Sequence, residues 1–233
     1  RIVWSFLGLP HSVPEWTARY RGIIYIIMKH SMNIKLVWVL ALWAAPSVLS
    51  ADPIKFDFKD PKKVNNVVFL LDAPLESING TATGVSGTVL FDPDKPAATT
   101  GKIVLAVSSL HVDNPVMKEH MLGEKWMDAS RFPVIEFVAD KMTKAKTSGS
   151  TTTATVAGRL TVKGVAKQVT VPVRLTYLKG LLAKRNRVPG DLLVLRADFK
   201  IKRSEYGINA GNNEEKVSDE IELKLRLAGA APH

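Results

Sequence analysis

The sequence predicts an all-β protein, an antiparallel eight-stranded β-barrel with a short helical insertion around 116–127. Two observations carry this prediction. Segments of alternating apolar and polar residues recur from about residue 54 onward, and only one interval shows helical spacing. Side chains alternate between the two faces of a strand, so each segment presents one apolar and one polar face. Many such strands without a long helix are typical of a sandwich or a barrel, and closing the sheet removes its exposed edges.

The predicted strands follow one another at short intervals. Asn79–Gly80 predicts a tight turn, and Gly84 and Gly87 predict a bend or bulge. Lys163–Gly164 predicts the turn of a hairpin, while 143–153 and 179–191 read as polar and basic loops. The predicted strands span 54–58, 66–72, 81–91, 102–108, 134–142, 156–162, 168–178, 193–201 and 219–228.

The helical interval begins after Asn114–Pro115 and ends before Phe132–Pro133. Its Met and Trp side chains suggest a lid over an apolar cavity, although ordinary packing onto the end of the barrel is an equal interpretation. These side chains are Met117, Met121, Trp126 and Met127.

A removable leader precedes the strands. Residues 32–50 have the layout of a secretory signal peptide: a basic start, an apolar stretch of about ten residues, and small residues near Ser50 and Ala51, where we expect cleavage. The apolar stretch is too short to span a membrane, which takes about 20 residues. We interpret 1–31 as a mistranslated or disordered extension, with Met28 or Met32 as the true start. The remaining 51–233 then form one domain in the periplasm or outside the cell.

The amino-acid composition argues against several classes of function. The chain carries 32 basic and 22 acidic residues and no cysteine. The basic residues are scattered among the strands without interleaved aromatic residues, which disfavours nucleic acid as a partner. The missing cysteines exclude disulfides, thiolate metal sites and a cysteine nucleophile.

The sequence contains no strong catalytic or metal-binding motif. His111, Asp113, Glu119 and His120 lie close in sequence, but their spacing matches no strong metal-binding pattern. There is also no phosphate loop and no nucleophile elbow. We therefore predict a binding protein, not an enzyme, without a cofactor. A metal-dependent hydrolase that uses His111 and His120 stays as an alternative.

Four segments together resemble the YceI-like family, in the family's order. The segment 158–169, Gly-Arg-Leu-Thr-Val-Lys-Gly-Val-Ala-Lys-Gln-Val, resembles its hairpin. The stretch 119–137, with Glu-His-Met-Leu, Trp-Met-Asp-Ala and Arg-Phe-Pro-Val-Ile-Glu-Phe, resembles its helical region. Residues 202–208, Lys-Arg-Ser-Glu-Tyr-Gly-Ile, and 84–93 resemble two further motifs. The resemblance implies a lipocalin-like barrel that holds a polyisoprenoid or similar amphiphile, and it implies no catalytic residues.

Alternation identifies the inward side chains that would contact such a lipid: Phe137, Val171, Val173, Leu175, Tyr177, Leu195, Phe199, Leu223 and Leu225. Five polar or aromatic residues are candidates for contacting a head group at the mouth: Trp126, Arg203, Tyr206, Lys184 and Arg185. Transient contact with a membrane surface and a homodimer are further expectations. A barrel with a filled core that serves protein interaction is the other alternative.

Overall fold

The computed structural model describes residues 52–233, so the predicted signal peptide at 32–50 and the extension at 1–31 lie outside the described residues. No helix in this part of the chain has the length and hydropathy needed to cross a membrane. The strands are β1 (Ile54–Asp57), β2 (Asn66–Asp72), β3 (Ser77–Ala82), β4 (Val85–Phe91), β5 (Thr100–Ala106), β6 (Leu110–His111), β7 (Val134–Ser148), β8 (Thr151–Val162), β9 (Val165–Leu178), β10 (Gly190–Lys202) and β11 (Glu220–Pro232). The helices are α2 (Pro115–Leu122) and α3 (Leu182–Asn186), with short 3-10 turns η1 (Pro96–Ala98), η2 (Val107–Ser109) and η3 (Arg203–Tyr206).

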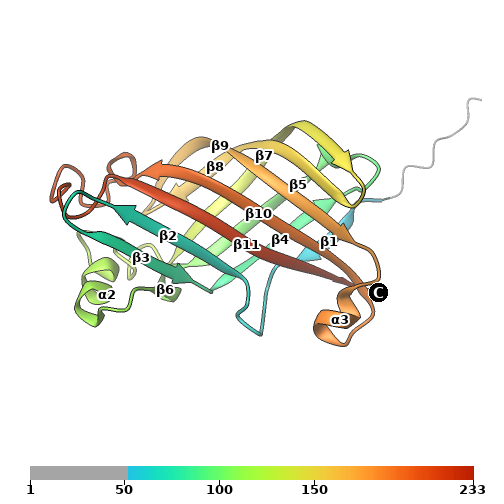
Figure 1. Ribbon diagram of the computed structural model, residues 1–233, viewed down its shortest axis with the longest axis horizontal. Helices are drawn as coiled ribbons and strands as arrows, with labels where there is room; N and C mark the ends of the chain where they lie inside the picture. The colour runs from blue at the N-terminus through green and yellow to red at the C-terminus, as the bar shows by residue number, and fades with distance from the viewer. Residues whose placement is uncertain (1–51) are drawn as a thin grey trace, which may run out of the picture. The chain divides into compact units, whose positions relative to one another are not determined.

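These strands close into an antiparallel barrel with eight strand positions, as predicted (Figure 1). β1 and β2 are two parts of one interrupted strand, because both pair with β11. β3 continues into β4, and β5 continues through η2 into β6, in the same way. Each position pairs with the next along the chain, and β11 returns to β1 and β2 to complete the ring.

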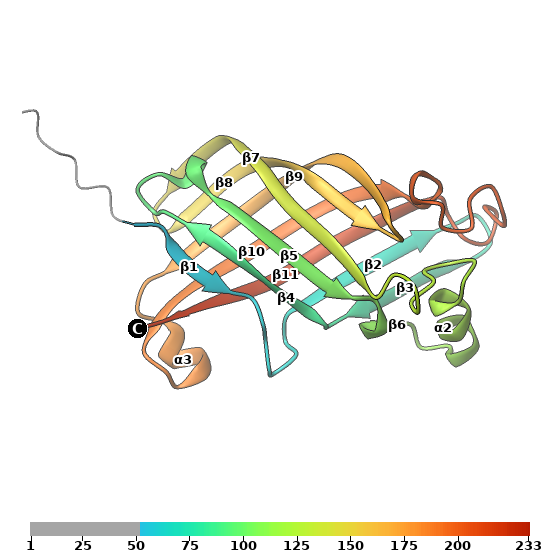
Figure 2. The ribbon, with the colours of Figure 1, turned by 180° about the vertical axis from the view of Figure 1, so that it is seen from behind.

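The two ends of the barrel carry different elements. α2 and the loop 203–219 lie at one end, while α3 and the C-terminus lie at the other (Figure 2). We call these the α2 end and the α3 end. A buried apolar cluster runs between them and includes Phe56, Phe69, Leu105 and Leu227.

Three local predictions were wrong. Asn79–Gly80 lies inside β3, and the turn falls instead at 73–76, where the Ala73 N–H donates to the Glu76 carbonyl. A Cβ atom at Gly80 would meet the Phe69 ring at 2.3 Å, so this glycine serves close packing. The predicted loop 143–153 is mostly the extended ends of β7 and β8, and the helix ends at Leu122 instead of 127.

The Lys163–Gly164 hairpin is confirmed. Both residues have positive φ, 48° and 76°, between β8 and β9. Two consecutive left-handed residues give a turn whose twist matches that of the flanking strands, and glycine is favoured there because it has no Cβ.

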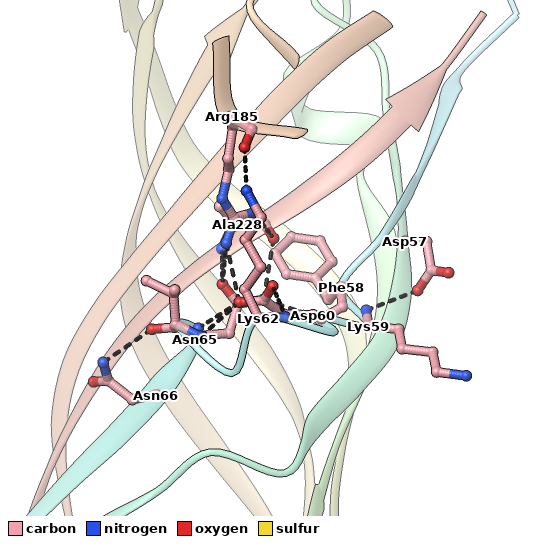
Figure 3. Close-up of polar contacts among 10 residues, drawn as sticks. Asp57, Phe58, Lys59, Asp60, Lys62, Asn65, Asn66, Arg185 and Ala228 are labelled. Carbon is pink, nitrogen blue, oxygen red and sulfur yellow. Dashed lines mark hydrogen bonds and ion pairs between the residues drawn. The ribbon is translucent and has the colours of Figure 1, made fainter. Parts of the chain in front are cut away.

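A side-chain amide bridges the interruption between β1 and β2. Asn65 is the last residue of the loop 58–65 and presents its amide to Ala228 of β11 (Figure 3). The Asn65 Nδ2 donates to the Ala228 carbonyl at 3.0 Å, and the Ala228 N–H donates to Asn65 Oδ1 at 2.8 Å. The amide therefore replaces the two backbone bonds that a continuous strand would make.

Asp60 holds this loop in shape. Its carboxylate accepts the N–H groups of Lys62, Val64 and Asn65 at 2.8 to 3.1 Å, and Arg185 Nη2 at 3.1 Å. Arg185 also donates to the Ala228 carbonyl at 3.1 Å. Burial alone would raise the pKa of Asp60, but the backbone donors and Arg185 outweigh it and lower the pKa. We call Asp60, Asn65, Arg185 and Ala228 the closure cluster.

We expect Arg185→Ala to lower the free energy of unfolding by about 3 kcal/mol, because it leaves the buried Asp60 carboxylate without its cation. Lys184→Ala is the matched control: it removes an exposed charge from the same helix and should change stability by less than about 0.5 kcal/mol. Urea unfolding measures both. Equal effects of the two variants would show that the closure cluster does not stabilise the barrel.

Candidate functional site: an apolar lumen

Three apolar cavities lie inside the barrel. The first, of about 130 Å³, is at the α2 end and is walled by apolar side chains together with Arg203. The second, of about 110 Å³, has only apolar residues around it. The third, of about 60 Å³, adds Thr99, Thr100 and Gly101 on one side. The interior is therefore hollow and almost entirely hydrocarbon.

The cavities form a series because neighbours share walls. The first and second share Val67, Leu105, Ile135 and Leu160. The second and third share Ile103, Phe137, Val173 and Leu195. Many inward side chains remain only partly buried for the same reason: they border empty space instead of packed atoms.

A larger depression of about 380 Å³ lies outside the first cavity, at the α2 end. We call it the vestibule. It shares Phe69, Leu71, Met121 and Trp126 with the first cavity, so these four side chains separate lumen from exterior. The polar residues that line the vestibule are Glu76, Asn114, His120, Asn213 and Lys216.

Helix α2 positions this entrance. Asn114 caps the helix by accepting the N–H groups of Val116 and Met117, and Pro115 occupies its first turn, where no N–H is needed. No residue of α2 is fully buried, and Val116 is 59% exposed. The element that carries Met121 over the lumen is thus held by its cap and a few apolar contacts.

The α3 end is sealed. Tyr177 packs edge-on against Phe56 and also against Phe91, with ring centroids about 6 Å apart. Its hydroxyl donates to Asp191 Oδ2 at 2.6 Å, and the Gly180 N–H donates to Asp191 Oδ1 at 2.7 Å. Burial and then the Asp191 carboxylate raise the pKa of Tyr177 to about 12. Burial opposes but does not outweigh the two donors to Asp191, whose pKa is lowered. These contacts close the α3 end on the side of Tyr177, while the third cavity borders Thr99 and the exposed Thr100.

Eight of the nine residues predicted from alternation to contact lipid line the cavities: Phe137, Val171, Val173, Leu175, Leu195, Phe199, Leu223 and Leu225. Tyr177 lines none of the three and belongs to the seal. Alternation did not reveal the contribution of the early strands, because the predicted inward set drew only on residues after 134. Val67, Phe69 and Leu105 were missed for that reason.

The five candidates for the mouth do not come together. Trp126 lines both vestibule and first cavity, and the Arg203 guanidinium lies 5.6 Å from its ring centroid. Lys184 and Arg185 are on α3 at the opposite end (Figure 1), where Arg185 belongs to the closure cluster. The prediction placed the basic residues of 179–187 at the mouth because of their charge alone. Charge does not reveal at which end of the barrel a loop lies.

Arg203 is fully buried and organises the loop beside the vestibule. Its five N–H donors reach five backbone carbonyls, those of Ser218, Ile208, Asn209, Asn212 and Val217. A guanidinium has five donors in all, so none is left for a head group. Arg203 therefore shapes the vestibule wall through the loop and the Trp126 ring.

Tyr206 is also fully buried, but its hydroxyl has no hydrogen-bond partner among the described residues. Burial, then the nearby Glu205 charge, raises the pKa of this phenol. The Tyr206 hydroxyl thus has unused polar capacity at the α2 end.

The two histidines of the metal hypothesis do not gather ligands. His111 is exposed on β6, with its Nε2 3.7 Å from Asp113 Oδ1, and His120 lies on the vestibule wall. Across residues 52–233 no three His, Asp or Glu side chains form a group suited to a metal ion.

Comparison with known proteins agrees with this architecture. The family model described as a YceI-like domain matches residues 60–228. A UPF0312 protein of Yersinia pestis is 29% identical over 151 residues, which is 64% of this chain and 72% of that protein. A UPF0312 protein of Pseudomonas syringae pv. syringae is 32% identical over 94 residues, which is 40% of this chain and 47% of that protein, so this chain spans about half the length of that relative.

Solved structures share the fold. The crystal structure of Burkholderia cenocepacia BcnA superposes with a TM-score of 0.59 at 25% identity, over 70% of this chain and 95% of that one. A polyisoprenoid binding domain from Saccharophagus degradans, implicated in plant cell wall breakdown, superposes with a TM-score of 0.57 at 12% identity, over 77% of this chain and 99% of that one.

Stability should fall in acid. Asp60 and Asp191 have lowered pKa values in the folded state, so their contribution is fully present above the unfolded carboxyl pKa of about 4. It is lost as the pH falls through the lower folded values. We expect a flat melting temperature from about pH 7 to 5 and a decline below about pH 4.

The double variant Asp60→Asn with Asp191→Asn should flatten that decline in melting temperature, and exposed Asp94→Asn should not. An unchanged acid slope in the double variant would contradict this assignment.

Tyr206→Phe should leave the free energy of unfolding unchanged or raise it by about 1 kcal/mol, because it removes a buried hydroxyl without a partner. Tyr177→Phe is the control, since it removes a hydroxyl that Asp191 binds, and it should destabilise by about 1 to 2 kcal/mol. Chemical denaturation separates the two. Equal losses would mean that the Tyr206 hydroxyl has a stabilising partner.

Proposed function

This chain belongs to the YceI-like domain family, and from that premise we propose that it holds an isoprenoid lipid or similar amphiphile in the lumen of its barrel. We further propose that it works after export, in the periplasm or outside the cell, as a carrier or store of that lipid. The observation that carries the proposal is the series of three apolar cavities that leads inward from the vestibule.

Such a lumen selects for a chain-like apolar ligand. Its walls offer almost no hydrogen-bond partner, so a polar ligand would lose its water contacts without replacement. A hydrocarbon chain gains about 25 cal/mol for each Å² removed from water. Burial of about 400 Å² would give about 10 kcal/mol before the costs of ordering and association.

The individual cavities are small, so the ligand must move side chains. Phe137 and Leu195 stand between the second and third cavities, and Met121 and Trp126 stand at the entrance. Methionine has three rotatable bonds and adapts readily to a guest. A prenyl chain would thread past these side chains by changing their rotamers, which favours a flexible ligand over a rigid one.

The α2 end is also the end from which we propose that lipid is taken from a membrane surface. Leu75 at the β2–β3 turn is 67% exposed and Val116 on α2 is 59% exposed, and the vestibule opens between the β2–β3 hairpin and α2. Exposed apolar side chains beside a cavity entrance are suited to shallow contact with a bilayer. The name of the Saccharophagus domain supports the ligand class, while binding and export by this chain stay a proposal.

The purified protein should release a prenyl lipid on organic extraction, detected by mass spectrometry at up to one equivalent. Leu225→Trp should reduce that yield at least tenfold, because Leu225 lines the second cavity and indole would fill it. Lys224→Trp is the matched control on the outward face of the same strand. A clean extract, together with no uptake of added geranylgeraniol, would refute lipid binding.

A further inference from the structure

The barrel wall has a seam between β9 and β10. These strands pair from Leu178↔Leu192 to Val173↔Ala197, and no ladder pair joins them beyond that point anywhere in the described chain. Residues 165–172 of β9 pair only with β8, and residues 198–202 of β10 pair only with β11. The seam therefore runs from the middle of the barrel toward the α2 end.

The sequence explains where the seam begins. Pro172 is the next residue of β9 after the last pair, and proline has no N–H to donate to a ladder. Exposed Lys200 and Lys202 follow on the β10 side. Charged residues and proline along an edge disfavour addition of another strand, so a peptide strand is a poor occupant of the seam.

Apolar space lies inside the seam and a groove lies outside it. The second lumen cavity and an outer groove of about 380 Å³ share two wall residues, Val173 and Ala197, which form the last ladder pair. The lumen and the outer surface thus meet at the point where the two strands separate.

Three arginines line that outer groove, side by side. Arg196 lies directly opposite Arg174 on β9 and Arg226 on β11, which places neighbouring Cβ atoms about 5 Å apart. Arg226 is paired with Asp198 at 2.7 Å. The guanidinium groups of Arg174 and Arg196 make no hydrogen bond or ion pair with the described residues. Like charges directly opposite each other destabilise a sheet, so an anion between them would relieve the repulsion.

The vestibule offers no comparable charge. Its lining holds one acid, Glu76, one Lys and one His, whereas three arginines face a single Asp at the seam. We propose that the seam is a side portal for an anionic amphiphile, whose phosphate- or carboxylate-class head lies on Arg174 and Arg196 while its chain passes between β9 and β10 into the second cavity. This rests on the proposed lipid binding and assigns the head group a place away from the barrel's end.

The test compares geranylgeranyl phosphate with geranylgeraniol, which have the same chain and differ in charge. The wild-type chain should bind the phosphate more tightly, and that preference should shrink with added salt. Arg174→Ala with Arg196→Ala should weaken phosphate binding at least tenfold and change alcohol binding less than twofold. Lys55→Ala with Lys141→Ala is the control, since it removes the same charge from exposed positions on β1 and β7.

The outcomes separate the two proposals. If the wild-type chain binds both lipids and the arginine variant keeps its preference for the phosphate, the portal is refuted and the lumen stands. The portal is refuted in the same way if the lysine control loses as much affinity, because net charge would then explain the effect. If the wild-type chain binds neither lipid, lipid binding itself fails, and the portal with it.

A second readout locates the head group. Cysteine is absent from this chain, so Thr170→Cys on the β9 edge and Lys118→Cys on α2 can each carry a single acrylodan label. Geranylgeranyl phosphate should shift the emission at 170 and leave that at 118 largely unchanged. A shift at 118 alone would place the head group at the vestibule and overturn the portal.

Discussion

A barrel with cavities along its centre depends more on its wall, because those cavities remove part of the packing that its buried apolar cluster would otherwise make. Dispersion and apolar burial are largest in a dense core, and here the inner side chains border empty space instead. The ring is complete only where β11 meets the interrupted first strand, and β1 contributes a single pair there, Asp57↔Ala230. Asn65 supplies the missing bonds at Ala228, while Asp60 and Arg185 hold its loop in place. Hydrogen bonds at the ring closure therefore add to the stability that the buried apolar cluster supplies.

The two ends of the barrel also differ in how densely they are packed. The α3 end concentrates the dense contacts: Phe56 and Phe91 around Tyr177, whose hydroxyl is tied to Asp191. The α2 end carries a helix without fully buried residues and a loop whose shape depends on one arginine. Local opening requires little free energy where few apolar contacts must break. A densely packed base with a loosely covered opposite end is the arrangement that a binding lumen needs.

Alternation along the strands predicted the barrel and the part of the lumen wall that the later strands supply, since the face on which a side chain lies follows from period two alone. Prediction from the sequence failed where one residue type can serve two different structural roles. Gly80 reads as a turn but gives room to Phe69 and the backbone of His111, and Tyr177 reads as a cavity residue but reaches Asp191 at the sealed end. The polar segment 143–153 became strand because β7 and β8 extend each other across a two-residue turn. The charge of Arg185 was visible, but its partner Asp60 lies 125 residues away, and sequence spacing does not reveal such contacts.

The seam and the vestibule together set a direction for a bound lipid. The seam opens on the second cavity, and the first cavity, nearer the vestibule, is larger than the third, at about 130 against 60 Å³. A chain anchored at Arg174 and Arg196 would therefore extend toward the α2 end, where Met121 and Trp126 can yield, more readily than toward the Tyr177 seal. The usable length would run from the middle of the barrel to the entrance, so the position of Pro172 along β9 would govern the chain length that the lumen accepts.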